Sequence, residues 1–136
     1  MTDISFEQFS FLVVDDDEFS CEVVSNALAA IGGTQIHCAN DSQGALNLAR
    51  QRHPDFVLLD IYMPQTDGWA LLSQLRRVAP EAAIVMITGS SAPADFRKSM
   101  EEQADGYCIK PVSSQIMHKT LLRARQLRQS GHRATH

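Results

Sequence analysis

The sequence predicts an α/β domain in which five helices cover a doubly wound, five-stranded parallel sheet. Short apolar runs alternate with segments whose apolar residues recur at helical spacing, and short connections join them. The chain has 136 residues, 44% hydrophobic and 21% charged, which is enough for one core and too few for two. We therefore expect a single domain over residues 1–136, with its core at about 9–128 and short flexible tails at both ends.

The first half of the chain predicts three strands and two helices. The expected strands are residues 9–14 (FSFLVV), 34–39 (TQIHCA) and 55–60 (DFVLLD). One helix is expected to begin near Glu18, and Asp41 or Ser42 is expected to cap the second. The apolar residues at helical spacing are Phe19, Val23, Ala27 and Leu28 or Ile31 in the first helix, and Ala45, Leu46 and Ala49 in the second.

The second half predicts two more strands and three helices. The expected strands are residues 82–88 (AAIVMIT) and 106–110 (GYCIK). Residues 63–68 (MPQTDG) are expected to form a turn before the third helix, Pro93 to open the fourth, and the fifth to start near Ser113. The apolar stripes are Trp69, Leu72, Leu75 and Val78 in the third helix, Phe96 and Met100 in the fourth, and Ile116, Met117, Leu121, Ala124 and Leu127 in the fifth.

Composition excludes several classes of protein. The formal charge of −4 and the pI near 5.6 argue against direct binding to nucleic acid. The apolar runs are too short for a membrane helix, and the N-terminus lacks the features of a signal peptide, so we expect a cytoplasmic protein without membrane contact. Cys21, Cys38 and Cys108 are expected to be reduced packing residues among apolar neighbours.

One basic concentration lies near the C-terminus. Its members are Lys119, Arg123, Arg125, Arg128 and Arg133. We expect a solvated helix face whose cations suit the negative end of the helix, with a docking face as the alternative.

Polar residues end four of the five expected strands, where ligands bind in such sheets. Asp15 and Asp16 follow the first strand and Asp60 ends the third; Thr88 ends the fourth and Lys110 ends the fifth. Singly, each has an ordinary explanation as a cap, a turn hydroxyl or a surface lysine. Together they favour three carboxylates that bind Mg²⁺, with a hydroxyl and an ammonium that contact a phosphoryl group. Asp60 then becomes the nucleophile that forms an aspartyl phosphate.

These motifs resemble the receiver domains of response regulators in two-component signalling, of the chemotaxis-regulator type. The matching segments are residues 12–17 (LVVDDD), 55–69 (DFVLLDIYMPQTDGW), 84–91 (IVMITGSS) and 104–112 (ADGYCIKPV). The resemblance covers about residues 9–128 and implies the flavodoxin-like strand order 2-1-3-4-5. It also implies a regulatory phosphoacceptor rather than an enzyme, which assists its own phosphorylation and slow dephosphorylation.

The resemblance implies a role for each site residue. Asp60 is the phosphoacceptor, Thr88 and Lys110 contact the phosphoryl group, and Thr88 and Tyr107 form the switch. Mg²⁺, with Mn²⁺ as the alternative ion, is bound by Asp15, Asp16, Asp60 and the backbone carbonyl of Tyr62. The Lys110–Pro111 peptide bond is expected to be cis. Asp17 has no role in the family and is expected at the entry to the first helix.

The implied partners follow from this chemistry. The donor is a histidine kinase or a phosphotransfer protein, and an unknown downstream protein binds the surface of the fourth helix, fifth strand and fifth helix. The chain is a monomer or a phosphorylation-dependent dimer, and either a stand-alone regulator or part of a longer protein. Tyr62 has no carboxylate or amide with which to position water, so we expect slow loss of the phosphoryl group.

Two other functions stay open. A haloacid-dehalogenase-like phosphatase would use Asp15 as nucleophile together with Asp17, and it would leave Asp60 without a role. The other alternative is an interaction module that keeps the fold but works without phosphorylation.

Overall fold

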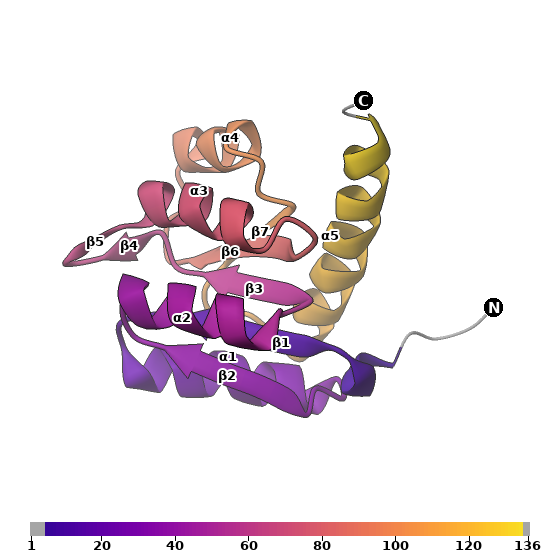
Figure 1. Ribbon diagram of the computed structural model, residues 1–136. Coiled ribbons are helices and arrows are strands. Elements are labelled where there is room, and N and C mark those ends of the chain that lie inside the picture. The colour runs from indigo at the N-terminus through magenta and orange to yellow at the C-terminus, as the bar shows by residue number, and fades with distance from the viewer. Residues whose placement is uncertain (1–4, 135–136) are drawn as a thin grey trace.

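The computed structural model describes residues 5–134, with side chains described as far as residue 130, and strands alternate with helices along the chain (Figure 1). The strands are β1 (Ser10–Val14), β2 (Gln35–Ala39), β3 (Phe56–Leu59), β4 (Tyr62–Met63), β5 (Thr66–Asp67), β6 (Ala83–Thr88) and β7 (Gly106–Ile109). The helices are α1 (Glu18–Ala30), α2 (Ser42–Arg52), α3 (Gly68–Val78), α4 (Pro93–Glu101) and α5 (Ser114–Ala134), and a 3-10 helix (Phe6–Gln8) precedes β1. The ends of the predicted flexible tails, residues 1–4 and 135–136, lie outside the described residues.

Five parallel strands form the main sheet, in the order β2-β1-β3-β6-β7. The short strands β4 and β5 form a separate antiparallel pair. The five longer strands therefore follow the order 2-1-3-4-5, and the predicted fold is confirmed. Because the strands are parallel, their carboxyl ends lie at one edge, with those of β1, β3 and β6 side by side.

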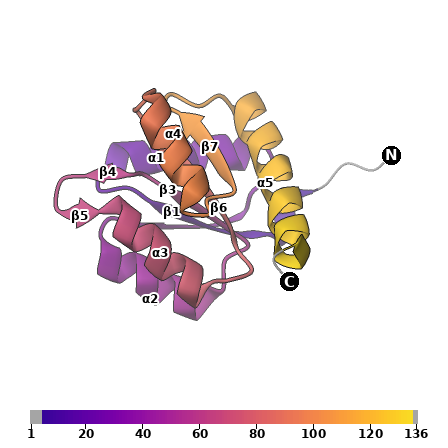
Figure 2. The ribbon, with the colours of Figure 1, turned by 90° about the horizontal axis from the view of Figure 1, so that it is seen from above.

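Helices cover both faces of the sheet, and Figure 2 shows α1 on the opposite side from α2 and α3. Successive side chains of a strand point to opposite faces. In β1, Phe11 and Val13 pack toward α1 and α5, whereas Leu12 and Val14 pack toward α2 and α3. All four are at most 2% exposed, so the apolar runs of the sequence correspond to strands buried on both faces. Among the described residues, no helix combines the length and apolarity needed to cross a bilayer.

Three predicted helix stripes are wrong in whole or in part. Phe19 and Val23 of α1 are 70% and 40% exposed, because α1 buries Cys21 and Val24 against the sheet in their place. Leu28 is buried as predicted. In α4, Phe96 and Met100 are 49% and 36% exposed, and Ser99 is the buried residue of that helix. In α5, Met117, Leu121 and Ala124 are buried as predicted, but Ile116 and Leu127 are 50% and 47% exposed.

The packed core begins before the expected boundary at residue 9. Phe6, in the 3-10 helix, is fully buried and its ring contacts those of Phe9, Phe11 and Phe56 at centroid distances of 5.9 to 6.2 Å. The rings of Phe11 and Phe56 stack at 5.3 Å across β1 and β3. This aromatic cluster fills the core on the α1 and α5 side, near the amino ends of β1 and β3.

The segment between β3 and α3 is more ordered than the predicted turn. Tyr62 and Met63 pair with Asp67 and Thr66 in the antiparallel pair β4–β5. The Asp67 carboxylate caps α3 by accepting from the backbone N–H groups of Trp69 and Ala70, at 3.0 and 3.2 Å.

Candidate functional site

The sequence-predicted site residues that end strands lie at the carboxyl edge of the sheet. The N–H of Asp60 donates to the Val14 carbonyl at 3.0 Å, and the N–H of Lys110 donates to the Thr88 carbonyl at 2.7 Å. These bonds extend the parallel ladders past the last residues of β3 and β7. They place the backbones of Asp15, Asp60, Thr88 and Lys110 along the same edge.

The three predicted metal ligands form an acidic cluster with Lys110 beside it. Carboxylate oxygens of Asp15, Asp16 and Asp60 all lie within 4.8 Å of one another. Asp15 is 2% exposed and Asp60 is 7% exposed, whereas Asp16 is exposed. Lys110 Nζ lies 2.6 Å from Asp15 Oδ2 and 3.1 Å from Asp60 Oδ2. One ammonium thus faces three carboxylates, and the cluster keeps a negative charge.

Burial and the Lys110 ammonium have opposite effects on the pKa of Asp60. Burial raises the pKa of Asp60 above its ordinary value, although hydrogen bonds from Lys110 and from the Tyr62 N–H partly offset the effect. Burial alone would lower the pKa of Lys110, but its bonds to Asp15 and Asp60 outweigh burial and raise it. Lys110 is therefore a fixed positive charge that helps to keep Asp60 ionised.

The residues present fit a hard divalent cation. Such an ion prefers carboxylate oxygens and retains several waters, and one exposed ligand beside two buried ones leaves a side open to water. Among the described residues, Lys110 is the only cation that forms an ion pair with Asp15 or Asp60, so a second cation would relieve the repulsion between these carboxylates. Asp60 Oδ1 also accepts from the Tyr62 N–H at 3.2 Å, which places that backbone beside the acids. The Tyr62 carbonyl as a ligand stays a prediction.

Asp17 lies apart from this cluster. Its carboxylate caps α1, accepting from the Phe19 N–H at 3.3 Å and from the Ser20 hydroxyl at 3.1 Å. This agrees with the expected place of Asp17 at the helix entry. It also disfavours the phosphatase alternative, in which Asp17 would work beside Asp15.

The two predicted switch residues lie near each other but do not touch the acids. Thr88 is fully buried, and its hydroxyl accepts from the Ser90 N–H at 3.3 Å. Tyr107 is partly buried, and its hydroxyl donates to the Ser90 carbonyl at 3.0 Å. Its ring packs edge-on against Phe96 at 5.6 Å. Ser90 therefore connects Thr88 to Tyr107. The Lys110–Pro111 bond is cis, as the resemblance implies.

Sequence reasoning missed the role of Asp95. Both carboxylate oxygens of Asp95, in the first turn of α4, lie 2.8 Å from the Tyr62 hydroxyl, and the Ser90 hydroxyl donates to the same carboxylate. An acid behind Pro93 in a first helical turn is usual, so the sequence offers no indication of these partners. They depend on β4 and α4 meeting in space.

The cysteines differ from one another. The buried thiol of Cys21 donates to the Asp15 carbonyl at 3.5 Å, and burial raises its pKa to about 12. Cys108 is also buried and donates to the Thr120 hydroxyl at 3.2 Å. Cys38 is exposed on the edge strand β2, 3.3 Å from the Ser25 hydroxyl, so the expectation of an apolar environment is wrong there.

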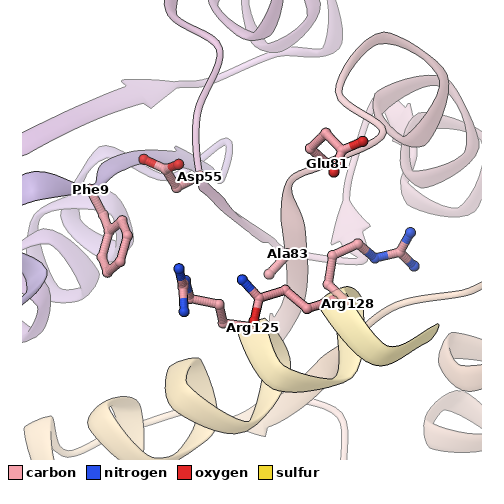
Figure 3. A pocket seen from close by; sticks show the side chains of 7 residues that line it. Phe9, Asp55, Glu81, Ala83, Arg125 and Arg128 are labelled. Atoms are coloured by element: carbon pink, nitrogen blue, oxygen red, sulfur yellow. The ribbon is translucent and has the colours of Figure 1, made fainter. Parts of the chain in front are cut away.

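A separate cavity of about 520 Å³ lies at the amino ends of β1, β3 and β6. Figure 3 shows Arg125 reaching from α5 toward Phe9, and its guanidinium lies 5.0 Å from the centre of that ring. Arg128 donates to Asp105 Oδ1 at 3.1 Å, and its side chain is 17% exposed. The prediction of a solvated basic face is therefore wrong for Arg128, while the side chain of Arg133 lies outside the described residues.

Comparison with known proteins gives one consistent family. The family model "Response regulator receiver domain" matches residues 11–122. A probable transcriptional regulator, ycf27 of Guillardia theta, is 34% identical over 111 residues, which are 82% of this chain and 43% of the relative. The regulatory protein AtoC of Escherichia coli is 33% identical over 116 residues, 85% of this chain and 25% of AtoC. The chain thus spans less than half the length of these curated relatives.

Solved structures agree with this result. The chemotaxis protein CheY4 of Vibrio cholerae is 26% identical with a TM-score of 0.77, over 85% of this chain and 98% of that one. A response regulator from Burkholderia pseudomallei, solved with a phosphorylated aspartic acid, a calcium ion and citrate, is 25% identical with a TM-score of 0.78, over 91% of this chain and 73% of that one. With the matched family model and this architecture, the chain belongs to the receiver domains of two-component response regulators.

Proposed function

We propose that this receiver domain, built on residues 9–128, accepts a phosphoryl group on Asp60 with the help of Mg²⁺. The observation that carries the proposal is the environment of Asp60: it directly follows the central strand β3, is 7% exposed, and lies beside the Lys110 ammonium and the other acids. The phosphorylated aspartic acid and the calcium ion in the Burkholderia pseudomallei protein support both parts. A regulatory role follows, since the acceptor itself carries the signal.

Each site residue has its own role in phosphoryl transfer. A carboxylate oxygen of Asp60 attacks phosphorus, an oxygen–phosphorus bond forms, and the bond from phosphorus to the donor breaks with its electron pair leaving on the donor. Lys110 Nζ, 3.1 Å from Asp60, is placed to contact the phosphoryl oxygens. The Thr88 hydroxyl, at the end of the adjacent strand, donates to the group once it is present. Mg²⁺ held by Asp15, Asp16, Asp60 and the Tyr62 carbonyl supplies further positive charge when bound.

Labelling from a small acyl phosphate tests this function. Wild-type protein should take up one phosphoryl group with Mg²⁺ and none with a chelator, and Asp60→Asn should abolish the uptake. Asp17→Asn is the matched control, because it changes an adjacent acid that only caps α1. Label that persists in Asp60→Asn and disappears in Asp15→Asn would favour the phosphatase. No label at all would leave the interaction module as the better account.

The donor is proposed to be a histidine kinase or a phosphotransfer protein. A groove of about 340 Å³ lies between α1 and the segment after β7, lined by the exposed Phe19 and Val23 and by Lys110, Pro111 and Val112. Lys110 belongs to both the groove and the acidic cluster. A donor that brings a phosphohistidine to Asp60 would therefore cover this apolar surface.

The output is proposed to be a change at the surface of α4, β7 and α5, where Mg²⁺ and phosphorylation favour one of two arrangements. Thr88 moves toward a phosphoryl group on Asp60 and takes Ser90 with it, because the Ser90 N–H is bonded to the Thr88 hydroxyl. The bond from Tyr107 to the Ser90 carbonyl transmits this movement. An unknown downstream protein reads the altered surface, as a partner of the monomer or of a phosphorylation-dependent dimer.

Tyr107→Ala tests the transmission step. Phosphorylation of Asp60 should stay near the wild-type level, because Tyr107 contacts Ser90 and Phe96 rather than the acids. The phosphorylation-dependent change in amide hydrogen exchange of α4 should be strongly reduced. Tyr107→Phe, which keeps the ring contact and removes only the hydroxyl, should give an intermediate change. An unaltered exchange response in Tyr107→Ala would remove this residue from the switch.

A further inference from the structure

Asp95 ties together three segments that the sequence separates. The Tyr62 hydroxyl, on β4, lies 2.8 Å from both carboxylate oxygens of Asp95, and the Ser90 hydroxyl, in the loop after β6, donates to the same group. Asp95 itself belongs to the first turn of α4, where Ser99 donates to its carbonyl at 2.9 Å. One carboxylate thus joins β4, the β6–α4 loop and α4.

The hydrogen bonds of Asp95 join two segments that lie next to the phosphoacceptor site. Tyr62 lies two residues after Asp60, and Ser90 lies two residues after Thr88. The strands that carry Asp60 and Thr88, β3 and β6, are neighbours in the sheet. The bridge from Tyr62 through Asp95 to Ser90 therefore connects the segments leaving the two strands between which a phosphoryl group on Asp60 would lie.

The contacts are specific rather than those of an ordinary helix start. The N-cap residue of α4, Ala92, provides no side-chain cap, yet the Asp95 carboxylate binds two hydroxyl groups from other segments instead of backbone N–H groups of its own turn. Tyr62 is 57% exposed, so packing alone does not fix its ring. Bonds from Ser90 and from Tyr62 lower the pKa of Asp95, which keeps its carboxylate ionised as an acceptor at neutral pH.

We propose that Asp95 is a positioning residue that holds the Tyr62 ring across the mouth of the phosphoacceptor site and so slows loss of the phosphoryl group. This inference rests on the proposed function. In the loss reaction a water oxygen attacks phosphorus, the bond from phosphorus to Asp60 breaks, and the electron pair returns to the Asp60 carboxylate. One proton of the water stays on the new phosphate oxygen, and the other passes to a second phosphate oxygen or to solvent. Asp95 touches none of these atoms; it acts by restricting where Tyr62 and Ser90 lie.

The rate of phosphoryl loss in four variants tests the proposal. Protein labelled from a small acyl phosphate with Mg²⁺ is freed of donor, and the remaining label is followed with time. Asp95→Ala and Tyr62→Phe should each speed the loss by about threefold or more, the lower end of the range expected when one typical hydrogen bond is removed. The double variant should lose label no faster than either single variant, because both changes break the same link. Glu101→Gln removes an acid from the other end of α4 and should keep the wild-type rate.

Urea unfolding of the same variants provides a readout that needs no phosphorylation. The losses of unfolding free energy in Tyr62→Phe and Asp95→Ala should be non-additive, and Asp95→Asn should recover part of the loss as an amide acceptor. Additive losses, or a wild-type rate of label loss in Asp95→Ala, would overturn the positioning role. Absence of label from wild-type protein would instead overturn the proposed function, and with it the proposed role of Asp95 in slowing phosphoryl loss. Non-additive unfolding would still show that Tyr62 and Asp95 interact.

Discussion

Gly68→Ala is expected to lower the free energy of unfolding by about 2 kcal/mol or more, a cost typical of overpacking. A Cβ atom at this buried position would lie 2.3 Å from the Ile61 carbonyl oxygen and 2.8 Å from two other backbone atoms of Ile61. Backbone cannot give way as a flexible side chain can, so the segment from Ile61 to Tyr62 must shift. That segment follows Asp60 directly, and phosphorylation should therefore slow as well. Urea unfolding and labelling measure the two effects.

Gly89→Ala is the matched control for stability. It makes the same chemical change beside Thr88, but a Cβ atom there would have no neighbour within 4 Å. The unfolding free energy should stay within about 0.5 kcal/mol of wild type, as for surface substitutions. Equal stability of the two glycine variants would contradict the close approach of Gly68 to Ile61.

Asp105→Ala is expected to lower the free energy of unfolding by about 3 kcal/mol, because it leaves partly buried cations without their partner. Asp105 is 6% exposed and accepts from Arg76 at 2.8 Å, from Arg128 at 3.1 Å and from the Ile84 N–H at 2.9 Å. Burial lowers the pKa of Arg76, an effect that Asp105 partly offsets. The variant should keep its phosphorylation site, since this network lies away from Asp60.

A second substitution separates the ion pair from simple loss of packing. Arg76→Met in the Asp105→Ala background should recover part of the lost stability, because it removes an unpaired cation and keeps an apolar stem. Glu102→Ala, which removes an exposed acid from the end of α4, should change little. A loss below about 1 kcal/mol in Asp105→Ala would show that solvent already screens the two arginines.

The sequence predicted the architecture because its strongest patterns are local. The runs that became β1, β3 and β6 are buried on both faces, and an uninterrupted apolar run is the pattern such strands require. The strand-end residues could be predicted from the same pattern. A residue that directly follows a buried parallel strand lies at the carboxyl edge of the sheet. Asp15, Asp60, Thr88 and Lys110 were therefore predictable as a group once the topology was assumed.

The remaining features depend on contacts that no local pattern records. Phe19 and Cys21 are both apolar and lie two positions apart on α1, and only packing against the sheet decides that Cys21 is buried and Phe19 is exposed. Arg128 belongs to a basic stretch, yet Asp105 lies within reach only in the folded chain. Asp95 meets Tyr62 across 33 residues of sequence. Each of these features depends on contacts between elements, so spacing along one element could not indicate it.

Direct location of the phosphoryl group tests the central claim most closely. The protein is incubated with a small acyl phosphate and Mg²⁺, and mass spectrometry of its peptides then identifies the modified side chain. Our account predicts one phosphoryl group on Asp60, formed only with the divalent cation and absent from Asp60→Asn. A group on Asp15, or intact Mg²⁺-saturated protein that gains no phosphoryl mass under these conditions, would contradict it.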